Sequence, residues 1–77
     1  MNKSQRDNLQ FWMDRANRFA DVDPKESKYN RAKAQSIVTL WCNKRQISTE
    51  AQARIIFGDM YDALVFEGYK FGNLEVA

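Results

Sequence analysis

The sequence of 77 residues lacks histidine altogether and contains a single cysteine, Cys42. Histidine is the commonest general base and metal ligand near neutral pH, so its absence argues against an enzyme. One thiol cannot form an internal disulfide, and without histidine it cannot build a zinc site. The scarcity of cysteine also fits a reducing compartment. We therefore expect no catalytic residue, no metal site and no cofactor.

Long apolar runs are missing as well. No segment approaches the roughly 20 consecutive apolar residues that a membrane-spanning helix needs. The first eight residues, MNKSQRDN, lack the apolar core of a signal peptide. We expect a cytoplasmic protein that has no membrane contact.

Apolar and aromatic residues are nevertheless plentiful. Hydrophobic residues make up 44% of the chain and aromatic residues 13%, a composition typical of a globular protein. A chain this short buries only about 60% of its unfolded surface, and large aromatic side chains help to compensate for that. The length predicts a single helical domain over residues 1–77.

Hydrophobic periodicity predicts an all-α domain with three helices, at about residues 4–20, 24–43 and 49–67. Asp23 is the expected N-cap of the second helix, and Pro24 suits its first position. Ser48 or Thr49 is expected to cap the third helix, and Gly68 to follow its last turn as C′.

The predicted fold is thus a small three-helix bundle with an ordered C-terminal apolar tail. In the helices, apolar side chains recur at i, i+3, i+4 and i+7, the spacing of one buried face. The residues expected to form the core are Leu9, Trp12, Met13, Phe19, Ile37, Trp41, Ile56, Phe57, Met60 and Leu64. The apolar residues of the tail are Tyr69, Phe71, Leu74 and Val76.

The third predicted helix carries more apolar surface than one buried face requires. Its main stripe runs from Ala53 to Leu64, and a second stripe at i, i+4, i+7 and i+11 lies roughly opposite. The second stripe contains Ile55, Asp59, Asp62 and Phe66. We interpret it as a partner-binding surface for a basic, partly hydrophobic protein, with Ile55 and Phe66 as apolar anchors. The alternatives are burial under the C-terminal tail and a homodimer seam between two copies of the chain.

Charge is distributed unevenly along the sequence. Residues 1–45 hold ten Lys or Arg against five Asp or Glu, whereas residues 46–77 hold two against five. A cationic surface that includes an aromatic residue can bind phosphates and stack a base, or bind an acidic protein. The residues assigned to such a surface, on the first two helices, are Arg15, Arg18, Lys25, Lys28, Tyr29, Arg31 and Lys33. The alternative is a solvated face that keeps the chain in solution.

A helix-turn-helix motif at the second and third helices is disfavoured. The turn between them lacks a glycine, and the third helix carries Arg54 as its only cation among several carboxylates. Asp59 and Asp62 could hold a hard cation, but no third carboxylate or glycine-rich loop accompanies them. Cys42 has no base partner that would activate it.

These observations favour a small non-enzymatic module that binds another protein. Such a module acts by occupying a surface, as a stoichiometric inhibitor or adaptor does. Phage and plasmid accessory proteins that target host nucleic-acid machinery are built on this scale, and we expect a role of that kind. The alternative function is nucleic-acid binding through the basic face of the first two helices.

Overall fold

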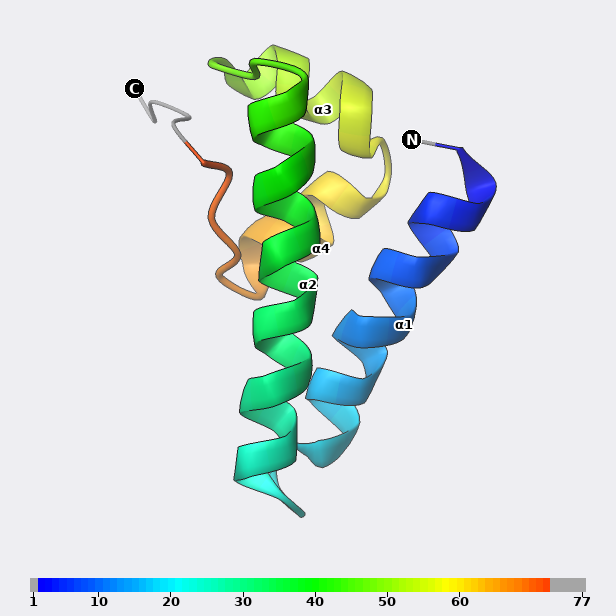
Figure 1. The fold of residues 1–77 in the computed structure, drawn as a ribbon, viewed down its shortest axis with the longest axis vertical. Helices are drawn as coiled ribbons and strands as arrows, with labels where there is room; N and C mark the ends of the chain where they lie inside the picture. The colour runs from blue at the N-terminus through cyan, green and yellow to red at the C-terminus, as the bar shows by residue number, and fades with distance from the viewer. Residues whose placement is uncertain (1, 73–77) are drawn as a thin grey trace. The chain divides into compact units, whose positions relative to one another are not determined.

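The computed structural model describes residues 2–72, and in this range the chain forms four α-helices and no strand (Figure 1). The helices are α1 (Lys3–Phe19), α2 (Pro24–Lys44), α3 (Glu50–Phe57) and α4 (Met60–Phe66). The all-α prediction is confirmed, whereas the prediction of three helices is wrong because residues 49–67 form two. Contacts divide the described residues into two compact units, Asn2–Ile37 and 38–72, and α2 passes from one into the other.

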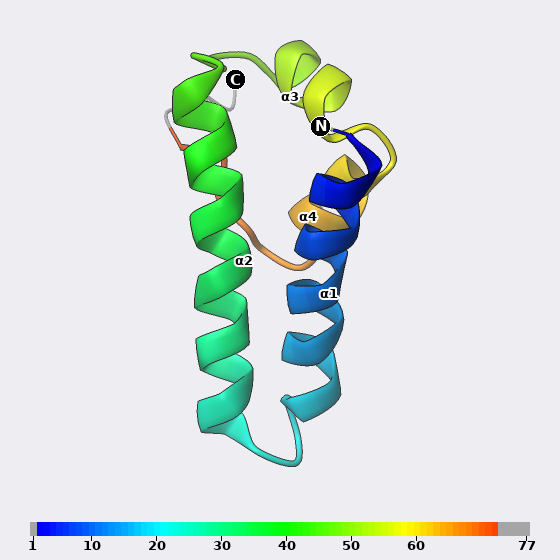
Figure 2. The same cartoon turned by 45° about the vertical axis from the view of Figure 1, so that its right-hand side comes forward.

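In the first unit, α1 and the first half of α2 run side by side in opposite directions (Figure 2). A capping box opens α1, where Asn2 and Gln5 exchange side chain–backbone hydrogen bonds of 2.9 Å. The Asp23 carboxylate accepts a 3.3 Å hydrogen bond from the Glu26 N–H, as expected of the N-cap of α2. The predicted start of α2 is therefore confirmed, and α1 begins one residue before its predicted start.

The core of the first unit is small and includes one polar residue. Leu9, Met13 and Ala16 are buried on α1, and Asn30 and Ala34 are buried on α2. The Ser27 hydroxyl also donates a 2.6 Å hydrogen bond to the Ala16 carbonyl, which ties the two helices together. Of the residues predicted for the core here, Leu9 and Met13 are buried, while Trp12, Phe19 and Ile37 are half-buried.

The second unit contains the end of α2, both short helices and the segment that follows them. The predicted core residues Trp41, Phe57, Met60 and Leu64 are buried, and Ile56 is half-buried. Tyr69 and Phe71 are buried too, and the Phe71 ring centroid lies 5.5 Å from that of Phe57 and 5.0 Å from that of Tyr61. Leu74 and Val76, which complete the predicted tail, lie outside the described residues.

The predicted continuous helix over 49–67 is interrupted at Gly58, which has φ 54° and ψ −130°. Thr49 caps α3 as predicted, through a capping box with Gln52. A Cβ at Gly58 would meet nothing within 4 Å, so the glycine is needed for its backbone angle and not for space. The apolar periodicity did not reveal the break, because the buried residues before and after Gly58 keep the spacing of one continuous helix.

The end of α4 agrees with the sequence prediction. Gly68 follows the last turn with φ 83°, and its N–H donates to the Val65 carbonyl at 3.0 Å. The Tyr69 N–H donates to the Leu64 carbonyl at 2.9 Å, which completes a Schellman motif. Within residues 2–72, none of the helices combines the length and the apolar composition needed to cross a membrane.

Candidate functional site

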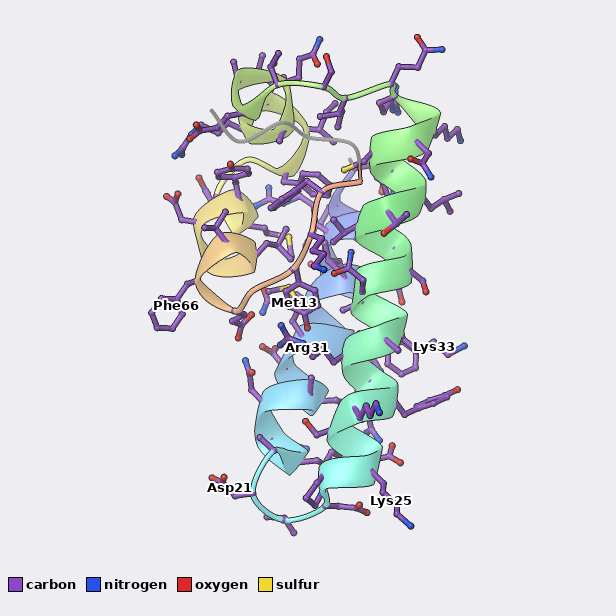
Figure 3. All side chains as sticks on the ribbon, turned by 90° about the vertical axis from the view of Figure 1, so that its left-hand side faces the viewer. Met13, Asp21, Lys25, Arg31, Lys33 and Phe66 are labelled. Atoms are coloured by element: carbon purple, nitrogen blue, oxygen red, sulfur yellow. The ribbon has the colours of Figure 1, made fainter. Side chains whose placement is uncertain are left out.

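The two predicted apolar anchors are the most exposed large hydrophobic side chains of the second unit. Phe66 is 90% exposed and Ile55 is 80% exposed. On α3, Ala53 and Phe57 are buried, and Ile55 lies between them in the sequence and therefore on the opposite side of the helix. On α4, the buried residues are Met60, Tyr61 and Leu64, and Figure 3 shows Phe66 pointing away from that helix.

The break at Gly58 changes the arrangement that the sequence analysis assumed. The predicted stripe required one continuous helix, whereas Ile55 lies on α3 and Phe66 on α4. Asp59 is the N-cap residue of α4, and Asp62 precedes Phe66 by one turn on its outer side. All four residues are exposed, but they do not form a single helical stripe. We call Asp59, Asp62, Val65 and Phe66 the α4 surface.

Arg54 links the two short helices next to this surface. Its Nη2 lies 2.9 Å from Oε1 of Glu50, and its Nη1 lies 3.2 Å from Oδ1 of Asp62. The guanidinium carbon also lies 4.6 Å from the centroid of the Tyr61 ring. The hydrogen bond to Glu50 is the largest cause that raises the pKa of Arg54, which stays charged. Exposed ion pairs contribute little to stability, so these contacts matter here because they place a cation beside Asp62.

Ile55 lies at the rim of a shallow hollow of about 200 Å³. The hollow is lined by Arg45, Gln52 and three isoleucines, Ile47, Ile55 and Ile56. The Arg45 guanidinium carbon lies 5.0 Å from the centroid of the Trp41 ring, which holds the charge at one edge. Ligand pockets usually exceed about 300 Å³, so this hollow suits one side chain of a protein partner better than a cofactor.

The structure separates the predicted basic residues of α2. Lys25, Lys28, Arg31 and Lys33 are all exposed, as is Tyr29. Figure 3 shows Lys25 and Lys33 on one side of α2 and Arg31 on the other. The Lys33 Nζ lies 5.4 Å from the centroid of the Tyr29 ring, so a cation and an aromatic ring are held together at this face. We call Lys25, Tyr29 and Lys33 the α2 basic face.

Arg15, which the sequence analysis assigned to the basic surface, makes contacts inside the first unit. Its Nη2 lies 3.3 Å from Oε1 of Glu26, and its Nε donates to Oδ1 of Asn30 at 3.4 Å. The Asn30 amide in turn donates to the Glu26 carbonyl at 2.8 Å. Arg18, in the last turn of α1, is exposed. The guanidinium of Arg15 therefore connects α1 to α2 and does not extend the predicted basic surface.

Arg15 also contacts two aromatic rings that were not predicted as its partners. The guanidinium carbon lies 5.5 Å from the centroid of Phe11 and 5.2 Å from that of Phe19. The i, i+4, i+8 spacing of these three residues was the available signal. Phe11 also makes an edge-to-face contact with Trp12, at 5.2 Å between the ring centroids. Phe11 is not among the residues predicted for the core, and it is 51% exposed.

The environment of Cys42 argues against a reactive thiol. The side chain is buried, and burial raises the pKa of the thiol above its ordinary value. The backbone of Gly72 passes so close that a Cβ there would lie 3.3 Å from the Cβ of Cys42. The residue therefore behaves as a small apolar side chain of the core.

Among the described residues, His, Cys, Asp and Glu do not gather into a group of three or more that could hold a metal ion. No protein-family model matches the chain, and no curated protein or solved structure matches it significantly.

Proposed function

We propose that this chain is a small non-enzymatic module that binds another protein through the α4 surface. The observation that carries the proposal is the 90% exposure of Phe66, at the outer side of a short helix whose inner side is already buried. Burying a phenylalanine side chain contributes about 1.5–3 kcal/mol, and a partner that covers this ring would gain that free energy.

The charges of the α4 surface indicate what kind of partner it is. Asp59 and Asp62 add two carboxylates to the surface that carries Phe66, and Arg54 holds Asp62 in place. An apolar pocket with lysine or arginine at its rim would match this surface in shape and charge. Ile55 and the adjacent hollow would add a second apolar contact on α3.

A module of this size acts by occupying a site on its partner. We extend the proposal to a stoichiometric inhibitor or adaptor that acts in the cytoplasm, of the kind that phages and plasmids direct against host nucleic-acid machinery. A host protein that binds nucleic acid presents cationic surface, and the carboxylates of the α4 surface would bind to it.

The test is to capture partners with the immobilised chain and with an I55D/F66D variant, using native lysate with and without nuclease. A partner captured in near-stoichiometric amount should survive nuclease and be lost with the double variant. The control is V22D, because Val22 is 80% exposed and lies between α1 and α2, away from α3 and α4 in the sequence. A partner retained by I55D/F66D, or lost with V22D as well, would contradict the proposal.

Nucleic-acid binding is the second candidate function, and the α2 basic face favours it. Lys33 lies over the ring of Tyr29, which is 53% exposed, so a phosphate and a stacked base could be bound at one place. Titration of short single-stranded DNA and RNA should then give an affinity that falls as salt is raised, and a K25A/K33A variant should bind more weakly. An affinity that stays the same as the salt concentration is raised would exclude phosphate contacts.

A further inference from the structure

We infer that the α4 surface of one copy binds the α2 basic face of a second copy, so that the chain associates with itself through two unlike surfaces. The inference rests on the proposed function in one respect, namely that the α4 surface is a contact surface. It adds a specific occupant and gives the basic residues of α2 a role.

Charge complementarity is the first argument. The α4 surface lies in residues 46–77, which carry two cations against five carboxylates, and the α2 basic face lies in residues 1–45, which carry ten against five. Glu26 could have offset the lysines of α2, but its carboxylate lies 3.3 Å from the Arg15 guanidinium. The cationic character of the α2 basic face is therefore retained. The α4 surface stays acidic although Asp62 pairs with Arg54, because Arg54 is shared with Glu50 and Asp59 adds another carboxylate, so the two surfaces attract one another.

The spacing of the side chains is the second argument. Asp62 and Phe66 are one helical turn apart on α4, and Lys25, Tyr29 and Lys33 are spaced by the same turn on α2. Residues four apart on a helix have Cβ atoms about 6 Å from each other. When Phe66 packs on Tyr29, Asp62 therefore meets an ammonium group in either direction of the helices. It meets Lys33 if the helices run antiparallel and Lys25 if they run parallel.

The exposed aromatic rings are the third argument. Phe66 and Tyr29 are both more than half exposed. Phe66 lies one turn from the Asp62 carboxylate, whereas Tyr29 lies beside the Lys33 ammonium group, so the charges next to the two rings are opposite in sign. In Figure 3, Phe66 points away from α4, and Lys25 and Lys33 point away from α2. Asp62 already accepts from Arg54, but a carboxylate has about four acceptor positions and can accept a second donor.

The contact between these unlike surfaces is isologous in a closed dimer, where it is made twice, and heterologous where copies add head to tail. Two copies can close a dimer if each surface reaches the other copy, and otherwise the copies add head to tail. In both cases the association depends on protein concentration and weakens as salt is raised, because exposed charges contribute to it.

Sedimentation equilibrium of the purified chain over a range of concentrations tests the inference with charge-reversal variants. D62K places a lysine opposite Lys25 and Lys33, and K25E/K33E places carboxylates opposite Asp62. Each variant alone should associate about tenfold more weakly than the original chain. An equimolar mixture of the two variants should recover association, because the introduced lysine of one variant then faces the introduced carboxylates of the other. V22D should behave as the original chain does.

Three results would overturn the inference: a chain that stays monomeric at millimolar concentration, association that the reversals leave unchanged, or a mixture that fails to recover. Circular dichroism of each variant verifies that the helices are retained, so a loss of association cannot come from unfolding. The outcome for the proposed function is independent of the outcome for this inference. Capture of a different protein that I55D/F66D abolishes, from a chain that does not self-associate, would refute this inference alone.

Discussion

At the residue scale, the polar contacts between α1 and α2 show what a hydrophobic pattern overlooks. Asn30 is fully buried and lies one turn before Ala34 on the inner side of α2. It is absent from the predicted core, whose members are all apolar. Its carboxamide is nevertheless satisfied by Glu26 and Arg15, and a buried polar group with partners is tolerated. Such a network depends on side chains from two helices, so no pattern within one helix reveals it.

Replacing Asn30 by alanine should therefore lower the free energy of unfolding by about 1–3 kcal/mol, since the Arg15 guanidinium and the Glu26 carbonyl, which are partly buried, lose a hydrogen-bond partner. Urea denaturation followed by circular dichroism measures the change. The matched control is N8A, because Asn8 is an exposed asparagine on α1, and the change there should stay within about 0.5 kcal/mol. Equal effects of the two substitutions would show that the Asn30 contacts do not stabilise the first unit.

At the element scale, the predicted N-caps of α2 and α3 and the predicted C′ residue after α4 are confirmed, whereas the break between α3 and α4 was not predicted. Thr49 and Gly68 have the roles that their residue types indicated. Residues 49–67 were predicted as one helix that runs through Gly58. Because the residues buried around it keep helical spacing, the pattern fits a straight helix and a broken one equally well. The straight and the broken helix differ in the backbone conformation of Gly58, and the pattern of apolar residues carries no information about that conformation.

Substitution of Gly58 tests whether the break is required. Alanine at φ 54° is strained, so G58A should lower the free energy of unfolding by about 1–3 kcal/mol. A chemically synthesised chain with D-alanine at this position is the matched control. Reversing the signs of φ 54° and ψ −130° gives the extended region that L-residues favour, so D-alanine fits without strain. A G58A chain as stable as the original would mean that α3 and α4 can join into one helix.

At the scale of the whole molecule, the chain keeps the side chains that stabilise it apart from those proposed for binding. Phe57 and Phe66 are two phenylalanines of the predicted helix over residues 49–67, yet Phe57 is fully buried and Phe66 is almost fully exposed. The sequence analysis placed each on the correct side, as core and as surface. It could not show that the surface is divided between two helices, because that depends on the break at Gly58.

The two phenylalanines therefore give opposite predictions for stability and binding. F57A should lower the free energy of unfolding by about 3–5 kcal/mol, because Phe57 is fully buried and its loss leaves a cavity beside Phe71. F66D should change it by less than about 0.5 kcal/mol, since a side chain 90% exposed has little to lose. Urea denaturation of both variants, alongside partner capture and sedimentation equilibrium, separates the two roles. If F66D were as destabilising as F57A, Phe66 would belong to the core, and its ring would not be available to a partner or to a second copy of the chain.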